Sequence, residues 1–331
     1  MTHVPVLAAE AVGALVPRDG GLYVDATFGG GGYTRLLLAQ ARCRVVAIDR
    51  DPEAVARAQD LARTEPRLSV VAARFGHMAQ ELRALGIDGV DGIALDLGVS
   101  SYQLDTAERG FSFRRPGPLD MRMDREGPSA ADLLATLDEA ELARILRTYG
   151  DEPDARRIAR AIVADRKAAP FTTTDALAGL VARVKGWRGG QDPATLTFQA
   201  LRMAVNDELG ELARALEAAE ELLRPGGRLV VVTFHSGEDS LVKRFIDQRG
   251  GRPAPSNRHL PPTAQATPRW RWVSRKVATA GALERVHNPR ARSAKLRVAL
   301  RLEAGARSSI SEAGVGEAGI SEGGEAWRRA A

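Results

Sequence analysis

Short apolar runs alternate with longer amphipathic ones over the first hundred residues. The apolar runs have the length and composition of buried strands and occupy residues 21–27, 44–49, 68–75 and 91–97. Helical periodicity occupies residues 4–16, 33–41 and 52–64, and Asp51-Pro52 is a helix-start signal for the last of these. Strands that alternate with helices predict a parallel, doubly wound α/β sheet.

Strand-like runs disappear between about residues 106 and 206. A loop rich in Gly, Pro and Arg at 109–124 precedes helical patterns at 130–149, 154–167, 174–185 and 195–223. Strand and helix patterns then return at 228–234 and 240–248, followed by a Pro-rich loop around 252–268 and strand-like runs at 269–276 and 295–302. We therefore predict an all-helical insertion, residues 106–206, in a discontinuous α/β domain of residues 1–105 and 207–303. Residues 304–331 have few large apolar groups, which predicts a disordered tail.

Composition narrows the class of protein. The 331 residues are 44% hydrophobic and 27% charged, as in soluble globular proteins. Cys43 is the single cysteine, which excludes a disulfide framework and fits a reducing cytoplasm. The N-terminus has no secretory pattern, and no apolar run has the length of a membrane span. The five histidines are scattered, so no metal site is expected.

Positive charge is concentrated near the C-terminal end. Residues 243–301 contain 15 Lys and Arg against Asp247 and Glu284, whereas the net charge of the whole chain is only +5. Such a concentrated field suits a polyanion, above all a nucleic acid, although a solvated face is the simpler alternative.

The first apolar run leads directly into four consecutive glycines, 29–32, and then into a helix pattern. A strand, a glycine turn and a helix start form a common binding place for nucleotide-like ligands. The dinucleotide fingerprint requires a third glycine, but Thr34 or Arg35 stands there. An acid at the strand end, Asp25, followed by the spaced pair Gly29 and Gly31, instead resembles the first motif of methyltransferases that use S-adenosylmethionine.

The ends of the next strands carry groups that suit the same ligand. Asp49 could accept hydrogen bonds from ribose hydroxyls, Phe75 could pack against adenine, and Asp96 lies near the end of the fourth strand. Alternatively, Asp49 caps a helix, for which Asp51 is better placed, and Phe75 belongs to the core. The pattern favours S-adenosylmethionine over NAD.

Longer motifs resemble one family, the RsmH (MraW) methyltransferases. They occupy residues 3–7, 96–105, 108–113, 117–124, 197–202, 205–209, 226–229, 234–236 and 288–297, which together span nearly the whole folded part of the chain. The resemblance implies a class I, Rossmann-like methyltransferase domain with an inserted helical domain. It also implies methylation of the N4 amine of a decoding-centre cytidine, cytosine 1402 of 16S ribosomal RNA, within the 30S subunit.

Seven residues would bind S-adenosylmethionine according to this resemblance: Gly31, Gly32, Tyr33, Asp49, Phe75, Asp96 and Gln103. The chain departs from the family pattern at four positions. Tyr33 replaces the usual His, Tyr102 the usual Pro, and Gly237 and Ser240 the usual Leu and Arg. The last change removes a positive charge near the site.

Three candidate catalytic positions follow from the reaction. The N4 amine of cytosine is a poor nucleophile, which an enzyme can assist by accepting its hydrogen bonds and aligning it with the methyl group. We expect Asp96, or a carbonyl after it, to polarise N4, and Ser100 or Ser101 to hold the pyrimidine. His235 is a weaker proton acceptor, since a lone histidine is more often structural. Methylation at C5 would need a nucleophilic cysteine, but Cys43 precedes the second strand, on the wrong part of the fold to reach a substrate.

The basic segment supplies the expected RNA contacts, Arg290, Arg292, Lys295 and Arg297. Trp270 and Trp272 lie on one face of a strand, where they could stack on bases or pack in the core. The sequence does not decide between a monomer and a homodimer. The alternatives to the predicted enzyme are a methyltransferase acting on protein or DNA, a catalytically silent ribosome assembly factor that binds RNA, and an NAD oxidoreductase.

Overall fold

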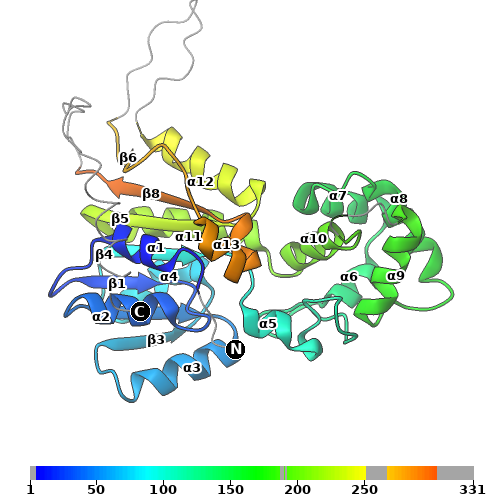
Figure 1. The fold of residues 1–331 in the computed structure, drawn as a ribbon, viewed down its shortest axis with the longest axis horizontal. Helices are drawn as coiled ribbons and strands as arrows, with labels where there is room; N and C mark the ends of the chain where they lie inside the picture. The colour runs from blue at the N-terminus through cyan, green and yellow to red at the C-terminus, as the bar shows by residue number, and fades with distance from the viewer. Residues whose placement is uncertain (1–4, 187–189, 191, 251–266, 304–331) are drawn as a thin grey trace, which may run out of the picture. The chain divides into compact units, whose positions relative to one another are not determined.

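A computed structural model describes residues 5–186, 190, 192–250 and 267–303, with the side chains of Pro289 and Arg290 excepted (Figure 1). The predicted tail and most of the Pro-rich loop lie outside these residues. The chain forms two compact units. One is an α/β unit formed before Val99 and after Leu209, and the other is a helical unit, Val99–Leu209.

The α/β unit is built on a sheet with the order β3-β2-β1-β4-β5-β8-β6, and β7 also pairs with β8. Strands β1 to β5 are parallel, whereas β8 runs antiparallel to β5, β6 and β7. The strands are β1 Leu22–Asp25, β2 Arg44–Asp49, β3 Leu68–Ala72, β4 Val90–Asp96, β5 Leu223–Thr233, β6 Trp270–Trp272, β7 Ala278–Thr279 and β8 Lys295–Arg301. The predicted Rossmann-like fold class is confirmed.

Helices cover both faces of this sheet (Figure 1). Because strand side chains alternate, Val46 and Ile48 of β2 face one hydrophobic core while Val45 and Ala47 face the other. The first core includes α4 Met78–Ala84, α11 Glu208–Leu222 and α12 Ser236–Arg249; the second includes α1 Ala8–Leu15, α2 Gly32–Gln40 and α3 Pro52–Ala62. The short α13 Ala282–His287 and the 3₁₀ helix η3 Pro289–Arg292 precede β8.

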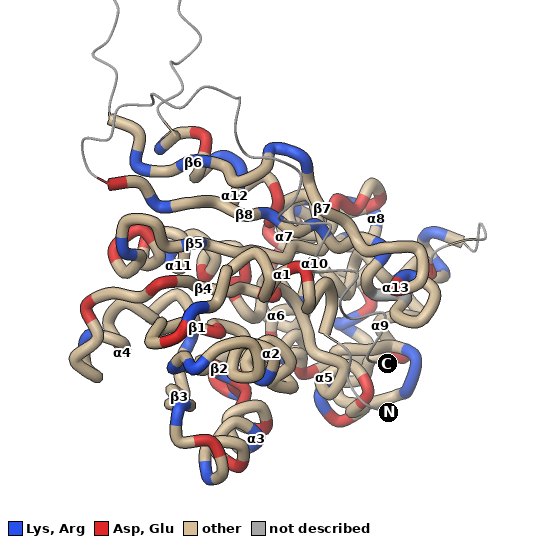
Figure 2. The backbone as a smooth tube through the Cα atoms, turned by 60° about the vertical axis from the view of Figure 1, so that its left-hand side comes forward, with Lys and Arg blue, Asp and Glu red and all other residues tan. Residues whose placement is uncertain are grey.

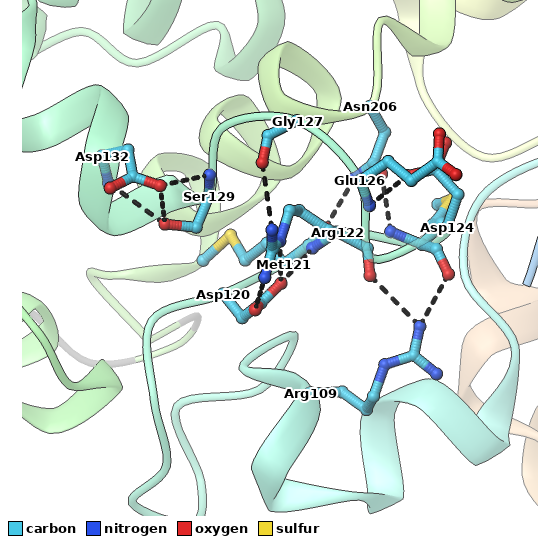
Figure 3. A network of polar contacts seen from close by, with 11 residues as sticks. Arg109, Asp120, Met121, Arg122, Asp124, Glu126, Gly127, Ser129, Asp132 and Asn206 are labelled. Carbon is cyan, nitrogen blue, oxygen red and sulfur yellow. Dashed lines mark hydrogen bonds and ion pairs between the residues drawn. The ribbon is translucent and has the colours of Figure 1, made fainter.

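The helical unit has its own core. Its helices are α5 Ser101–Asp105, α6 Ala130–Thr136, α7 Glu139–Gly150, α8 Ala155–Asp165, α9 Thr174–Lys185 and α10 Thr195–Val205, and the 3₁₀ helix η2 covers Ala107–Arg109. Three of the motifs that carry the family resemblance, 108–113, 117–124 and 205–209, meet at a loop of this unit (Figure 3). The Asn206 side chain donates to the Met121 carbonyl at 2.7 Å and accepts from the Met123 amide at 2.9 Å. The buried Arg109 donates to the Met123 carbonyl at 2.9 Å. These motif residues therefore stabilise a loop.

Several predicted boundaries were wrong for local reasons. The pattern at 130–149 forms two helices, because Asp138 caps the second by accepting from the Glu141 amide. The pattern at 195–223 is interrupted where Asp207 adopts a left-handed φ of 49°. The strand at 269–276 is reduced to Trp270–Trp272. The third strand ends at Ala72, so Phe75 begins the 3₁₀ helix η1 Phe75–His77 instead of ending a strand.

Candidate functional site

The strand order places a topological switch point at the carboxyl ends of β1 and β4. From β1, the chain adds β2 and β3 on one side and β4 and β5 on the other. Ligands of open α/β sheets bind at such a switch point. Here it is flanked by the glycine turn that follows β1 and by Asp96 at the end of β4.

The glycine turn is held in place by carboxylates of the sheet. Gly29 and Gly31 have φ values of 51° and 78°, in the left-handed region that glycine tolerates. The Gly29 amide donates to Oδ2 of Asp49 at 2.8 Å. At the far end of the turn, Asp25 accepts from the Thr34 hydroxyl at 2.7 Å and from the Thr34 amide at 3.1 Å. Asp25 is buried, which raises its pKa to about 6 against the opposing hydrogen bonds from Thr34.

Asp49 retains acceptor capacity beside this turn. Its Oδ2 accepts from Gly29 and its Oδ1 from the Asp51 amide at 2.9 Å. A carboxylate has about four acceptor positions, so about two remain for a ligand. Burial raises the pKa of Asp49 despite these two hydrogen bonds. Helix α3 is capped by Asp51, as predicted, which accepts from the Glu53 amide.

Asp96 has the least satisfied carboxylate of the three. Its Oδ1 is buried and has no hydrogen-bond partner among the described residues. Its backbone amide donates to the Thr27 hydroxyl at 2.7 Å, which ties β4 to the chain after β1. Burial raises the pKa of Asp96 well above its usual value, and the nearby carboxylates of Asp25, Glu238 and Glu284 raise it further. A buried acceptor without a donor is a candidate group for a hydrogen bond from a ligand.

Gly32 and Tyr33 lie at the start of α2, but the Tyr33 side chain points into the second core. Its hydroxyl donates to the Val6 carbonyl at 2.7 Å, and only 3% of the residue is exposed. Burial and neighbouring carboxylates raise its pKa well above 10, so it remains a donor. In the described conformation, the tyrosine side chain binds the N-terminal segment of the chain.

Phe75 lies just after β3 and packs against the first core. The adjacent amide of Gly76 donates to Oε2 of the buried Glu211 at 3.0 Å. Glu211 comes from α11, far along the chain, and so fixes the segment that carries Phe75. Sequence patterns gave no indication of this contact.

His235 caps α12. Its Nδ1 accepts from the Glu238 amide at 3.4 Å, and its Nε2 lies 3.0 Å from Oε1 of Glu238. The second contact lacks hydrogen-bond geometry, so the ring is held by the capping contact. Glu238 also accepts from the Phe234 amide at 2.8 Å. The ring thus has a structural role at the end of β5, next to β4.

Ser100 and Gln103 belong to the helical unit and cap α5 together. The Ser100 hydroxyl accepts from the Gln103 amide at 3.3 Å, and Gln103 Oε1 accepts from the Ser100 amide at 2.9 Å. Gln103 is buried. The structure therefore groups Gly31, Gly32, Tyr33, Asp49 and Asp96 around the switch point, whereas Ser100 and Gln103 lie in the other unit.

Two of the four predicted RNA-binding cations form ion pairs within the protein. Arg297 contacts Asp239 at 2.6 Å with only 12% of its side chain exposed, and Lys295 lies 3.3 Å from the same carboxylate. These pairs lower the pKa of Asp239 despite its partial burial. Arg292 is exposed, and the Arg290 side chain lies outside the described residues.

The two tryptophans have structural contacts. Trp270 is 1% exposed and meets the ring of Phe245 edge-on at 5.9 Å. The Trp272 indole donates to Asp247 at 2.8 Å. The predicted common face is consistent with these contacts, which favour the packing alternative over base stacking.

Sequence reasoning did not identify Glu238 and Glu284, whose carboxylates contribute to the negative electrostatic field at Asp96. Glu284 had a signal in the sequence, since it is one of two acids among 15 basic residues. The other, Asp247, is the partner of Trp272. An isolated acidic residue in a basic segment can therefore indicate a specific contact within the protein.

The residues present fit a nucleoside with a cationic end. Asp49 offers acceptors beside the turn, and Asp96 offers a buried oxygen that no described residue contacts by a hydrogen bond, near other carboxylates. Over the described ranges, no group of three or more His, Cys, Asp or Glu is arranged to hold a metal ion, and no helix is long and apolar enough to cross a membrane.

Comparisons with known proteins agree with the motifs. The model of the MraW methylase family matches residues 1–302. Ribosomal RNA small subunit methyltransferase H of Rhodopseudomonas palustris (strain TIE-1) is 55% identical over 309 residues, which cover 93% of each chain. The protein of the same name from Parvibaculum lavamentivorans is 56% identical over 307 residues, covering 91% of this chain and 90% of that one. That of Azorhizobium caulinodans is 52% identical over 322 residues, covering 97% and 93%.

Proposed function

The chain belongs to the MraW methylase family, and we propose that it transfers a methyl group from S-adenosylmethionine to the exocyclic N4 amine of cytosine 1402 in 16S ribosomal RNA of the 30S subunit. The observation that carries this proposal is the buried Oδ1 of Asp96, which has no hydrogen-bond partner in the described part of the chain, at the switch point beside the glycine turn. The names of the relatives support the RNA substrate.

The cofactor site is assigned to the glycine turn and the strand ends around it. Asp49 would accept hydrogen bonds from the ribose, and Phe75 would contact the base. Gly31, Gly32 and Tyr33 would provide backbone against the amino-acid part, and Gln103 remains a candidate from the family resemblance. Bound S-adenosylmethionine would supply an electrophilic methyl group on a positively charged sulfur.

Asp96 would act on the amine through its free acceptor. An amine conjugated to a pyrimidine ring gains electron density when its N–H groups donate to a carboxylate, and the same contact orients it. The low-dielectric surroundings that raise the pKa of Asp96 also strengthen such a hydrogen bond. Ser100 remains a candidate to hold the pyrimidine edge. His235 is a weaker proton acceptor because its ring caps α12.

The RNA contacts are assigned to exposed cations of the basic segment. Arg292 keeps this role, and we add Arg271, Arg275, Lys276 and Arg285, which are exposed. Figure 2 shows basic positions along β6, β8 and the segment between β6 and β7. Lys295 and Arg297 become secondary candidates, because contact with phosphate would require them to leave Asp239.

The direct test is methyl transfer from labelled S-adenosylmethionine to 30S particles from a strain without this gene, with naked 16S RNA in parallel. We expect the label at N4 of cytosine 1402 and a large loss of activity in Asp96→Ala. Near wild-type rates in both Asp96→Ala and His235→Ala would refute the catalytic assignment. Label at another nucleotide or atom would refute the substrate assignment.

A silent RNA-binding assembly factor remains the alternative from another class. Calorimetry distinguishes it, because such a factor need not bind the cofactor. Heat of binding with S-adenosylmethionine, abolished or weakened in Asp49→Ala, supports the enzyme. No heat from freshly prepared protein that binds 30S particles would support the silent factor.

A further inference from the structure

Residues 5–7, here called the N-terminal strap, are fastened at three successive positions. Pro5 packs on Gly32, where an added Cβ would lie 2.3 Å from Pro5 Cγ. The Val6 carbonyl accepts from the Tyr33 hydroxyl at 2.7 Å, and the Leu7 amide donates to Oε1 of Glu284 at 2.8 Å. Val6 and Leu7 are buried.

The conformation of the strap depends on these contacts. Leu7 has φ 50° and ψ 34°, a left-handed conformation that is strained for a non-glycine residue. Its carbonyl accepts from the Ala11 amide at 2.8 Å, which starts α1, while its own amide is satisfied by Glu284. Without Glu284, a buried amide in a strained turn would lose its acceptor.

The strap braces the part of the chain that follows the glycine turn. Gly32 and Tyr33 are the first two residues of α2. The strap touches both, one through Pro5 and the other through Val6. Glu284 also lies near enough to Asp96 to raise its pKa, so the contact between Glu284 and the strap is close to the switch point. A shallow depression of about 410 Å³, lined by residues that include Pro5, Gly32 and Glu284, marks the same junction.

We propose that Tyr33 and Glu284 are positioning residues that latch the N-terminal strap onto the start of α2 and thereby hold the glycine turn in the conformation that retains S-adenosylmethionine. This inference rests on the proposed cofactor site. It assigns to Tyr33, which replaces the histidine usual in the family, a contact with the strap through its side chain. It assigns to Glu284 a role as hydrogen-bond acceptor.

The test uses the full chain and matched pairs of variants. Tyr33→Phe removes the hydroxyl that binds Val6, and Tyr23→Phe is its control, because Tyr23 is equally buried and its hydroxyl donates to the Val16 carbonyl. Glu284→Ala removes the acceptor of Leu7, whereas Glu284→Gln retains an oxygen there. Glu10→Ala removes another carboxylate that lines the same depression.

Two measurements separate the latch from general stability. Calorimetry gives the Kd of S-adenosylmethionine well below the unfolding temperature, and hydrogen exchange without ligand reports the Leu7 amide. Tyr33→Phe and Glu284→Ala should each raise Kd about fivefold, the loss expected for one hydrogen bond, and accelerate exchange at Leu7. The kcat of Glu284→Ala at saturating cofactor should stay within about twofold of wild type. Tyr23→Phe, Glu284→Gln and Glu10→Ala should keep Kd within about twofold.

Unchanged Kd in Tyr33→Phe and Glu284→Ala would overturn the inference, even if exchange at Leu7 accelerates. A Kd for Glu284→Gln that matches that of Glu284→Ala would overturn the acceptor role. An equal rise of Kd in Tyr23→Phe would reduce Tyr33 to a general stability effect. If wild-type protein does not bind S-adenosylmethionine, the proposed cofactor site itself fails and the inference falls with it.

Discussion

Three aspartates at neighbouring strand ends differ in how many hydrogen bonds their carboxylates accept within the protein. This difference separates their roles. Asp25 accepts hydrogen bonds from the amide and the hydroxyl of Thr34, within the fold. Asp49 accepts hydrogen bonds from the Gly29 and Asp51 amides and retains acceptor capacity for a ligand. Asp96 has a buried oxygen that accepts no hydrogen bond from the residues that the structure describes. The sequence shows three equivalent acids, and only their hydrogen bonds distinguish a structural group from a binding group.

Asp49→Ala should weaken S-adenosylmethionine binding about 10- to 100-fold, since it removes hydrogen bonds to a charged acceptor. Calorimetry measures this directly. Asp51→Ala removes the neighbouring helix cap and serves as the control: it should cost about 1 kcal/mol of unfolding free energy with little change in Kd. A similar loss of binding in both variants would count against the ribose role of Asp49.

The pH profile of kcat/KM tests Asp96. A carboxylate accepts hydrogen bonds from the amine fully only when it is deprotonated, and the pKa of Asp96 in the free protein is raised well above 3.8. We therefore expect activity to fall on the acid side at a pH well above the usual aspartate range. In Asp96→Asn this limb should be absent and the remaining activity low. Retention of the same limb in that variant would assign it to another group.

Asp25 makes a prediction about stability. Its folded pKa of about 6 exceeds the unfolded value near 3.8, so its stabilising contribution is present at low pH and is lost as pH rises through 6. Between pH 4 and 6.5 the unfolding free energy of wild type should decline relative to Asp25→Asn by up to about 3 kcal/mol. Urea unfolding at several pH values measures the difference. Thr34→Val, which removes a donor to the charged form, should make the decline steeper.

At the scale of elements, neighbouring glycines are required for different reasons. Gly31 has φ 78°, and an added Cβ would lie 2.6 Å from the Phe28 ring. Gly32 lies inside α2 and is restricted by Pro5 alone among its nearest neighbours. The glycine run thus combines one position fixed by backbone conformation with another fixed by the N-terminal strap.

Gly31→Ala should destabilise the protein by about 2 to 4 kcal/mol, because both its conformation and its space forbid a side chain. Gly32→Ala should displace the strap, accelerate exchange at the Leu7 amide and raise the Kd of S-adenosylmethionine. Adding Pro5→Gly to Gly32→Ala should restore much of the lost unfolding free energy, whereas adding it to Gly31→Ala should not. Equal rescue of both would contradict the assignment of Pro5 to Gly32.

At the scale of the whole molecule, the basic segment serves both the fold and its expected partner. Arg249 pairs with Glu217 and Glu220, and Arg297 pairs with Asp239. Among the described side chains from β6 to η3, those of Arg271, Arg275, Lys276, Arg285 and Arg292 are exposed. The net charge of the basic segment therefore overstates the number of cations that are available to contact phosphates.

Replacing Arg271, Arg275 and Lys276 by alanine together should weaken binding to 30S particles and lower the slope of log affinity against log salt by about 2, since each phosphate contact on single-stranded RNA contributes about 0.7. Arg297→Ala is the matched control. It should cost about 1 to 3 kcal/mol of unfolding free energy through loss of its pair with Asp239, with the salt slope unchanged. A reversed pattern would assign the RNA contacts to β8 instead.

The sequence was sufficient where local pattern decides the structure. Buried strands such as 44–49 and the capped helix after Asp51 were predicted because their apolar periods and caps lie within a few residues. Phe75 was misplaced because the strand ends where its pairing with β2 ends, at Ala72 opposite Asp49. The packing of Trp270 and the ion pairs of Arg297 depend on partners from α12, and no local pattern contains them.

The sequence by itself determined the α/β class, the glycine turn, the acids at the strand ends and the family resemblance, since these depend on short-range periodicity and on motifs read along the chain. Tertiary structure alone decided which acid keeps a free oxygen, which cations are already paired, and how Pro5, Tyr33 and Glu284 meet at the strap. The physical reason is distance along the chain: Leu7 and Glu284 are separated by 277 residues, yet a single hydrogen bond of 2.8 Å joins them. Such a contact exists only after folding has brought the segments that carry Leu7 and Glu284 together.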